Sequence, residues 1–471
     1  MSRPRKGGDI SAIFVHAGAG YHSHHNERSH LEACENAAKA AMALLKNGGS
    51  AVDAVELAIM LLEDSEITNA GYGSNLTLDG KVECDAAIID HEGRSGAAGA
   101  VSHVKNPISL ARVILDTSSN PLSLHRVPPN FLVGSGATDF AYENRLPVLP
   151  HDALIAEGAK QRWKRWSCEL RHADMVAKKK AGAQQNLNDR HIRQPLQYNP
   201  AQLLTTPSSI ATPVTSNADQ ASFPGFSAAP IQNQVQDTVV DEASSAQLQQ
   251  SMDMDTPDFP TPDLRSGDDA DDVSDTVGAI AVDSFGNIAA GSSSGGIGMK
   301  HPGRVGPAAL LGIGTAVIPA DPSDPDKAQV ATVTSGTGEH IATTMAANTC
   351  ALRIYYSQRK CSDGLFEEVT EDEALKGSIV TDFLGHPGVK RSHCEGAIGI
   401  MAVKKTVDGI YLFFGHNTES FALASMNSED RKPVSVMSRN NKGHGNVAQG
   451  GRVCRRKRHK VASSRTGSSS Q

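Results

Sequence analysis

A polar stretch at residues 183–274 interrupts an otherwise regular pattern of strands and helices, and this interruption constrains the fold more than any other feature. The stretch is rich in Gln, Asn, Ser, Thr, Pro and Asp and holds few large apolar side chains. Such a segment buries too little apolar surface to offset the conformational entropy that ordering would cost, and it is much longer than ordinary loops. We therefore predict one folded unit interrupted by a long disordered insert, rather than two domains.

Patterns typical of strands and helices lie on both sides of this stretch. Before it come a strand, two helices, a pair of strands and another helix, at residues 12–20, 29–49, 50–65, 82–90, 95–102 and 106–116. A basic helical stretch with both tryptophans follows at 151–182, and after the insert come a hairpin, a strand–turn–helix unit and a second hairpin, at 276–294, 328–356 and 396–420. The expected organisation is an N-terminal part of the domain, the insert, a C-terminal part and a flexible basic tail, at 10–182, 183–275, 276–425 and 426–471.

Composition and charge argue against several classes of protein. The net charge of −7 disfavours a nucleic-acid partner, because nucleic-acid-binding domains are typically basic. The seven cysteines are scattered and form no C-x-x-C pair, which argues against a disulfide framework or a zinc site. No apolar run reaches the about 18 residues of a membrane span, and the first apolar stretch is too short for a signal peptide. We expect a soluble protein of a reducing compartment.

The border between Asp275 and Thr276 separates the acidic end of the insert from a strand in which apolar and polar residues alternate. A threonine hydroxyl needs an adjacent base to act as a nucleophile. If the chain is cut before Thr276, the freed α-amine, with a reference pKa of about 8, lies beside the hydroxyl and can accept its proton. Taken alone, a threonine at the start of a strand is most often an ordinary strand residue.

Three motifs beyond the border supply what such a nucleophile needs. The run SSSGG at 292–296 ends the strand expected to pair with that of Thr276. The turn KHPGRVG at 300–306 presents a guanidinium suited to gripping a carboxylate. The segment TSGTGEH at 334–340 places backbone amides at a helix start, where they favour an anion or oxyanion. Each motif alone fits an ordinary glycine turn, but their combination behind one threonine indicates a catalytic site.

Together with HAGAG at 16–20 and TNAGYGSNLTLDGKVECDAAIID at 68–90, these motifs resemble the plant-type asparaginase family of N-terminal nucleophile hydrolases, and within it the threonine aspartase (taspase) branch. The resemblance covers residues 10–150 and 274–425. It implies an α+β fold, a four-layer αββα sandwich, and autocatalytic cleavage into α and β chains. It also implies an αβ heterodimer that usually pairs into a dimer of heterodimers, and it implies no cofactor and no catalytic metal.

The resemblance assigns roles to the residues around the nucleophile. Thr276 would be the nucleophile, exposed by cleavage of the bond that joins it to Asp275. Ser294 would support its hydroxyl and amine. Ser335 and Gly336 would supply the oxyanion hole.

The resemblance also assigns the residues that bind the substrate. Arg304 would hold the substrate's α-carboxylate or, in a peptide-cleaving member, another acidic group near the scissile bond. Gly336 would contact the substrate as well, and Gly338 would shape the same turn. Gly18 would approach the site, and the loop at 68–75 would support the nucleophile, as the loop that coordinates a monovalent cation does in some relatives.

Two departures from the asparaginase pattern favour an endopeptidase. Asparaginases typically carry an Asp three residues after the arginine, which pairs with the substrate's α-ammonium, and here that position is Pro307. An unpaired buried charge costs roughly several kcal/mol, whereas an internal peptide segment brings no ammonium. The residue before the nucleophile is typically Gly in asparaginases and is Asp275 here. We therefore expect an autoprocessing threonine endopeptidase that cuts protein substrates after aspartate.

Two alternatives remain open: an L-asparaginase or β-aspartyl (isoaspartyl) peptidase on the same fold, and a binding protein that keeps the fold without the activity. The expected partners are protein substrates and further copies of the chain. The basic stretches within 160–182 and at 455–460 fit either solvated surfaces or nuclear import signals. We expect the protein in the nucleus and cytoplasm.

Two further groups of residues have ordinary structural interpretations. The histidines of the first turn have no Cys or carboxylate at ligand spacing, so they predict a surface loop rather than a metal site; they are His16, His22, His24 and His25. Asp85 and Asp90 lie five residues apart in a strand and face opposite sides, so they are not a catalytic pair. We expect Asp85 to be a structural hydrogen-bond partner.

Overall fold

The computed structural model describes residues 10–192, 275–440 and 445–455, and of 181–192 the backbone alone. The chain divides into one compact unit formed by 1–177 and 268–471 and a second formed by 178–267. Of the second unit, only the end of helix α5 (Glu157–Ile192) is described. The expected insert therefore lies outside the described residues, except for Asp275 and for 183–192, which continue the helix.

The first unit contains two β-sheets packed face to face. The larger has eight strands in the order β14-β13-β1-β5-β6-β2-β3-β4, with bounds β1 (Ala12–Gly20), β2 (Cys84–Ile89), β3 (Ser95–Val101), β4 (Phe131–Val133), β5 (Val277–Val282), β6 (Ile288–Ser294), β13 (Ser420–Asn427) and β14 (Val434–Arg439). The smaller has five strands in the order β15-β12-β11-β8-β7, with bounds β7 (Thr315–Ile318), β8 (Gln329–Gly336), β11 (Ile398–Thr406), β12 (Gly409–His416) and β15 (Ala448–Cys454).

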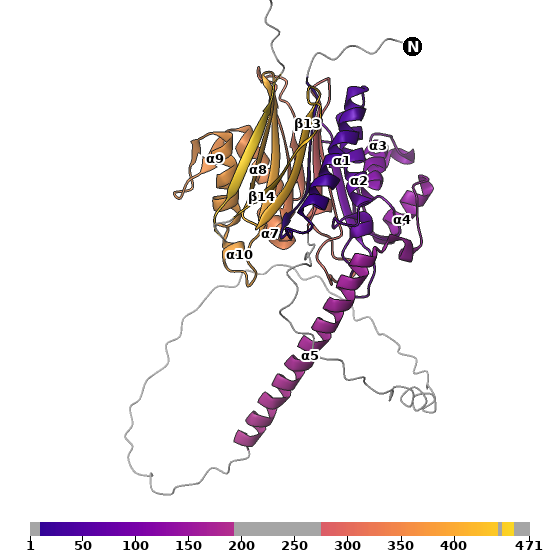
Figure 1. The fold of residues 1–471 in the computed structure, drawn as a ribbon, viewed down its shortest axis with the longest axis vertical. Coiled ribbons are helices and arrows are strands. Elements are labelled where there is room, and N and C mark those ends of the chain that lie inside the picture. Colours follow the sequence, from indigo (N-terminus) through magenta and orange to yellow (C-terminus); the bar gives the residue numbers. More distant parts are fainter. Residues whose placement is uncertain (1–9, 193–274, 441–444, 456–471) are drawn as a thin grey trace, which may run out of the picture. The chain divides into compact units, whose positions relative to one another are not determined.

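Helices cover the outer face of each sheet (Figure 1). The larger sheet is covered by α1 (Glu27–Lys46), α2 (Ala51–Glu63) and α3 (Pro107–Ser118), with α4 (Gly134–Glu143) beside β3. The smaller sheet is covered by α7 (Gly338–Thr344), α8 (Ala346–Tyr355) and α9 (Glu371–Gly377), followed by the short α10 (Pro387–Lys390). A separate two-stranded ribbon is formed by β9 (Gln358–Lys360) and β10 (Phe366–Glu368). The four layers run helix, sheet, sheet, helix, which confirms the predicted αββα sandwich.

Strand β1 illustrates why the chain folds into layers. Successive side chains of a strand point to opposite faces, so Ile13 and Val15 pack under the helices α1 and α2 while Phe14 packs between the sheets. Both faces are apolar, and the strand is buried on both sides. It pairs antiparallel with β5 on one side and β13 on the other, which joins the beginning of the chain to its later half.

The predicted strand pairs form as expected. The hairpin β5–β6 pairs Val277 with Ser293, and β11–β12 forms the second hairpin. Helix α2 begins with a capping box, in which the Ser50 hydroxyl accepts the Asp53 N–H and the Asp53 carboxylate accepts the Ser50 N–H. No helix in the described ranges is long and apolar enough to cross a membrane.

The prediction of a flexible tail from residue 426 onward is wrong for the described part of that segment. Strand β14 adds to the edge of β13, and β15 adds to the edge of β12. Most of their side chains are exposed or half-buried, as Val434 and Ser435 are. Edge strands need only one covered face, so a polar composition is compatible with them. Most of the basic run at 455–460 lies outside the described residues.

Candidate active site

Thr276 lies at the entrance of β5, in the middle of the larger sheet. The Asp275–Thr276 peptide bond is intact in this single chain, and it is buried: Asp275 is 2% and Thr276 7% exposed. The border that the sequence indicates is therefore held inside the protein, with Asp275 ordered as part of the site.

Ser335, at the end of β8 in the smaller sheet, connects the two sheets at this point. Its hydroxyl oxygen accepts the Thr276 N–H at 3.2 Å and the Ala19 N–H at 3.0 Å. In the intact chain, the side chain thus contacts the nitrogen that cleavage would turn into the α-amine. The role expected of Ser335 and Gly336, an oxyanion hole, stays a prediction for the cleaved protein.

Ser294, at the end of β6, contacts the other side of the same peptide bond. Its hydroxyl accepts the Gly296 N–H at 3.0 Å and donates to the Asp275 carbonyl over a long distance of 3.4 Å. The expectation that Ser294 supports the hydroxyl and amine of Thr276 stays a prediction. In the structure, the Ser294 hydroxyl meets the Asp275 carbonyl oxygen.

The loop at 68–75 holds the glycines that follow Ser294. The Asn69 side chain donates to the Gly296 carbonyl at 2.8 Å and accepts the Asn75 N–H at 2.9 Å, and the Asn69 carbonyl accepts the Gly295 N–H at 2.8 Å. A Cβ placed on Gly295 would lie 2.5 Å from the Cβ of Ser74. The loop therefore holds the glycines at the end of β6, directly after Ser294.

The first turns of α5 pack against this loop. Trp163 donates its indole N–H to the Thr77 carbonyl at 3.0 Å, and Trp166 lies so close to Gly298 that a Cβ there would meet its ring at 2.2 Å. Arg162 donates to the Gly73 carbonyl and the Asn75 side chain, both at 3.3 Å. The interpretation of this basic stretch as a solvated face is wrong for its first part, where one side of the helix contacts the loop, and correct for 168–180, which are exposed.

Glycine is required at two positions around the Asp275–Thr276 bond. Gly18 has φ +108°, and a Cβ placed on it would lie 2.0 Å from the Cβ of Asp275. Gly336 has φ +140°, and a Cβ there would lie 2.2 Å from the Ala397 carbonyl oxygen. Both values of φ belong to a region that residues with a side chain rarely adopt. Gly18 thereby makes room for the side chain of Asp275.

The carboxyl group of Asp275 contacts His22, which the sequence predicts to lie on the surface. The Nε2 atom of His22 lies 3.1 Å from Oδ2 of Asp275, and both side chains are buried. His16 is also fully buried, and burial lowers its pKa to about 3. The prediction of an exposed loop is wrong for these two histidines and correct for His24 and His25, which are exposed.

Arg304 lies beside Gly296 and Gly306, which follow β6, and Gly338, which begins α7. A Cβ on Gly306 or Gly338 would lie 2.7 or 2.6 Å from its guanidinium nitrogens. It donates from Nε and Nη2 to Oε1 of Glu339 at 3.1 and 2.7 Å. Partial burial raises the pKa of Glu339, but the hydrogen bonds and charge of Arg304 outweigh burial and lower it overall. Arg304 thus binds a carboxylate of its own chain.

Asp85 and Pro307 shape the turn that carries Arg304. The Asp85 carboxylate accepts the Ala100 N–H at 2.8 Å and the Gly306 N–H at 2.7 Å, so the prediction of a structural hydrogen-bond partner is confirmed. Burial raises the pKa of Asp85, although nearby cations and these hydrogen bonds oppose the shift. Pro307 is buried, and its ring would lie 2.9 Å from a Cβ on Gly338.

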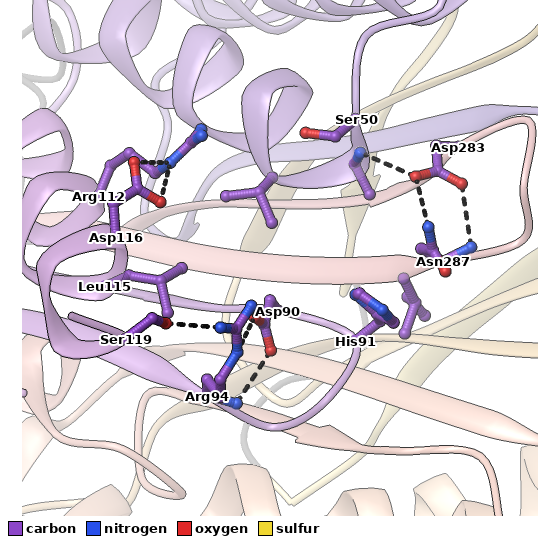
Figure 2. A pocket seen from close by; sticks show the side chains of 13 residues that line it. Ser50, Asp90, His91, Arg94, Arg112, Leu115, Asp116, Ser119, Asp283 and Asn287 are labelled. Atoms are coloured by element: carbon purple, nitrogen blue, oxygen red, sulfur yellow. Dashed lines mark hydrogen bonds and ion pairs between the residues drawn. The ribbon is translucent and has the colours of Figure 1, made fainter. Parts of the chain in front are cut away.

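A concavity of about 250 Å³ lies at the far end of β5 and β6 (Figure 2). Its arginines are already paired, Arg94 with Asp90 and Arg112 with Asp116. Asp283 lines this concavity and directly follows β5. The six-residue strand β5, about 20 Å long, therefore separates the concavity from Thr276. It is not part of the candidate active site. Among the described residues, no group of three or more His, Cys, Asp or Glu side chains could hold a metal ion.

The four-layer sandwich with a threonine at the entrance of a central strand is the arrangement of an N-terminal nucleophile hydrolase. The comparison with protein families identifies the particular group. The chain belongs to the asparaginase family, whose model, described as "Asparaginase", matches residues 10–194 and 190–409. The predicted family is confirmed.

Three relatives illustrate the similarity. The isoaspartyl peptidase/L-asparaginase of Danio rerio is 36% identical over 159 residues, which are 33% of this chain and 48% of that protein. The isoaspartyl peptidase/L-asparaginase of Rattus norvegicus is 40% identical over 163 residues, 34% of this chain and 46% of that protein. The isoaspartyl peptidase of Salmonella typhimurium is 27% identical over 385 residues, 80% of this chain and 90% of that protein. The chain thus spans about half the length of the first two, and none of the three is named a threonine aspartase.

Proposed function

We propose that the protein is an autoprocessing threonine endopeptidase, of the threonine aspartase type, that cuts its own chain between Asp275 and Thr276 and then cuts protein substrates after aspartate. The observation that carries the proposal is the position of its own Asp275–Thr276 bond. That bond is buried in the site. The Asp275 carbonyl accepts from the Ser294 hydroxyl, the Thr276 N–H donates to the Ser335 hydroxyl, and the Asp275 carboxyl group contacts His22. A segment held in this way is what a bound aspartyl substrate would resemble.

Self-cleavage would proceed through an ester. The Thr276 hydroxyl attacks the Asp275 carbonyl carbon, the C–N bond breaks, and the hydroxyl proton ends on the released nitrogen. Water then opens the ester, which leaves a carboxylate on Asp275 and both a free hydroxyl and a free α-amine on Thr276. The hydrogen bond from Ser294 to the carbonyl oxygen supports the first step, because negative charge develops on that oxygen.

In the cleaved protein, the Thr276 α-amine would act as the base for its own hydroxyl. The hydroxyl attacks the carbonyl carbon of a substrate aspartate and forms an acyl-enzyme, while the proton passes through the amine to the leaving nitrogen. Water then releases the product. Ser335, whose hydroxyl already meets the Thr276 nitrogen, supports this role by orienting the amine.

The isoaspartyl peptidase or L-asparaginase activity of the named relatives is the second candidate. Their names favour it. Glu339 also favours it, because its carboxylate lies beside Arg304 and offers a negative charge to a substrate ammonium. Pro307 speaks against it, because it brings no carboxylate to the position where an asparaginase has one. The burial of the Asp275 side chain speaks for cleavage after an internal aspartate.

Intact mass spectrometry of the recombinant full-length chain tests self-cleavage. Two fragments that meet between Asp275 and Thr276 are expected from the wild type, and one uncut chain from Thr276→Ala. A stable single chain in both would instead support a binding protein without activity. The substrate class is tested with the cleaved protein on an aspartate-containing peptide, asparagine and β-aspartyl dipeptides. Faster release of ammonia or amino acids than peptide cleavage would establish the second candidate.

The proposal extends to assembly and location. The two fragments should remain together as an αβ heterodimer, because β5 stays paired with β1 and β6 with β2 after a cut before Thr276. We further propose a dimer of heterodimers, protein substrates as partners, and residence in the nucleus and cytoplasm. Size-exclusion chromatography with light scattering tests the assembly, and imaging of the tagged full chain tests the location.

A further inference from the structure

We propose that a groove on the outer face of the smaller sheet, at the β11–β12 hairpin, binds the basic run that follows β15 in the same chain. The run begins at Arg455 and ends at Lys460. The inference goes beyond the proposed function and does not depend on it, because it involves neither Thr276 nor a substrate. It concerns a surface on which the basic run is held by its own protein.

The groove lies at the end of the sheet where the hairpin turns. Tyr411 and Phe413 of β12 line it, together with Thr406 and Asp408 of the hairpin. The loop at 324–328, before β8, and one side chain each from α8 and α9 line the rest, and the groove encloses about 490 Å³. Tyr411 and Phe413 are only half-buried. The groove therefore offers aromatic surface that a further segment can cover.

Arg455, the first residue of the basic run, already lies on this surface. Its guanidinium carbon is 5.3 Å from the centre of the Tyr411 ring, and its Nη2 donates to the Tyr411 hydroxyl oxygen at 2.7 Å. A cation in this position is attracted by the ring electrons. Gly409 gives the side chain room, because a Cβ there would lie 3.0 Å from Cγ of Arg455. The chain thus enters the run beside the turn that carries Asp408.

The groove carries an excess of negative charge. Lys404 also lines it, against four carboxyl groups, which belong to Asp324, Asp326, Glu371 and Asp408. Lys404 is paired with Glu371 at 2.8 Å, and Asp324 accepts two backbone N–H groups of its own loop, both at 2.9 Å. The carboxylates of Asp326 and Asp408 are exposed, and within the described part of the chain they receive no hydrogen bond or ion pair. These two carboxylates are available to a cationic segment.

Tyr355 of α8, which also lines the groove, is affected by the same charges. Burial raises the pKa of its hydroxyl, and the carboxylates of Asp324 and Asp321 raise it further. Lys327, in the same loop, does not line the groove and donates to the Pro322 carbonyl at 2.7 Å. A cation that enters the groove is therefore attracted by the carboxylates and is not opposed by Lys327 in its lining.

The rest of the basic run fits this groove by charge and by length. It carries four cations besides a histidine, in the order Arg456, Lys457, Arg458, His459 and Lys460. Guanidinium groups stack on aromatic rings, and both kinds of cation pair with carboxylates. Five extended residues span up to about 17 Å, whereas Tyr411 and Phe413 lie two strand residues apart, about 7 Å. The run is long enough to cross the groove, and binding there would withhold it from other acidic partners.

Limited digestion of the full-length protein with trypsin tests the binding, because trypsin cuts after lysine and arginine. Mass spectrometry follows the loss of the residues beyond 455. The double variant Asp326→Asn/Asp408→Asn should be cut there about threefold to tenfold faster than the wild type, since each exposed ion pair contributes modestly. The ratio should approach one in about 0.5 M salt, which screens exposed charges.

A matched control separates the groove from a general change of charge. Asp139→Asn/Asp152→Asn removes two exposed carboxylates that do not line the groove, and this variant should be cut at the wild-type rate. Equal rates in the wild type and both variants at low salt would overturn the inference. Equal acceleration in both variants would overturn it as well, because the effect would then not belong to Asp326 and Asp408.

Cross-linking with a carbodiimide identifies the occupant, because this reagent joins a lysine amine to a carboxylate in direct contact. Cross-links from Lys457 or Lys460 to Asp326 or Asp408 are expected. An equal mixture of isotope-labelled and unlabelled full-length protein shows whether one chain supplies both residues. Cross-linked peptides with one isotope composition support the inference. Peptides of mixed composition would assign the groove to the basic run of a second copy, and absence of these cross-links would leave the groove to another partner; either result overturns the inference.

Discussion

The Ser335 hydroxyl oxygen lies 3.2 Å from the backbone nitrogen of Thr276 and accepts its N–H. The same oxygen accepts the Ala19 N–H, so the side chain is fixed by β1 of the other sheet before any cleavage takes place. Cutting the chain converts the Thr276 nitrogen from an amide into an amine without requiring Ser335 to move. The base that we propose would therefore already be in position in the intact protein.

Replacing Ser335 by Ala should slow the cleaved protein on an aspartyl peptide by about tenfold to a hundredfold, because the amine loses the group that orients it. The unpaired Ala19 N–H should also lower the free energy of unfolding by about 1–3 kcal/mol. The turnover number of the purified, processed protein measures the first effect and chemical denaturation the second. Ser323→Ala, on an exposed loop, is the matched control. An unchanged turnover number would contradict the assignment.

Ser294→Ala should slow self-cleavage. The hydrogen bond to the Asp275 carbonyl is lost, and removal of one such donor typically slows a reaction by about a hundredfold. The rate is followed as the loss of full-length chain by gel electrophoresis after rapid purification. Ser294→Thr keeps the hydroxyl and should retain most of the rate. If both variants process equally slowly, the hydroxyl is not what matters at this position.

The sequence predicts the parts of this structure that depend on local patterns. The apolar run of β1, the alternation of β5 and the glycine-bounded hairpins all form where expected. Three of the motifs around Thr276, at 16–20, 292–296 and 334–340, could be recognised one by one, because each combines a strand end with a glycine turn. Their common location follows from the resemblance and is visible only when the two sheets are packed together.

The sequence does not predict contacts made between distant segments. His22 is buried because Ser420, 398 positions away, lies beside it in the neighbouring strand. Nothing in the spacing of the four histidines distinguishes His22 from the exposed His24. The strand β14 likewise forms because β13 offers a free edge, and its own polar composition resembles that of a tail. Each error arises where a distant partner, and not the local pattern, determines burial.

Gly18→Ala should prevent self-cleavage and destabilise the intact chain. The new Cβ would overlap the Asp275 side chain, and φ of +108° adds backbone strain. Gly48→Ala isolates the strain, because φ there is +88° and no atom lies within 4 Å. Chemical denaturation, with Thr276→Ala added to every chain so that none is cut, should therefore give Gly18→Ala the larger loss of stability. Asp275→Gly should recover at least about 1 kcal/mol in the Gly18→Ala chain and not in the Gly48→Ala chain. Equal effects in both would contradict the predicted overlap.

Glu63 should make the stability of the protein fall as pH rises. It is fully buried, accepts the Ser293 hydroxyl at 2.7 Å and the Ile108 N–H at 3.0 Å, and burial raises its pKa to about 8. A carboxyl group whose pKa is raised by folding stabilises the protein below its unfolded value, and that contribution is lost as pH climbs toward 8. At pH 8, the free energy of unfolding of Glu63→Gln, which carries no charge, should therefore exceed that of the wild type by on the order of 3 kcal/mol. At pH 4 the two free energies should be nearly equal. The exposed Glu143→Gln should leave both values unchanged. A stability difference between the wild type and Glu63→Gln that stays constant from pH 5 to 8 would mean that the buried carboxyl group is already ionised at pH 5, and would contradict the raised pKa.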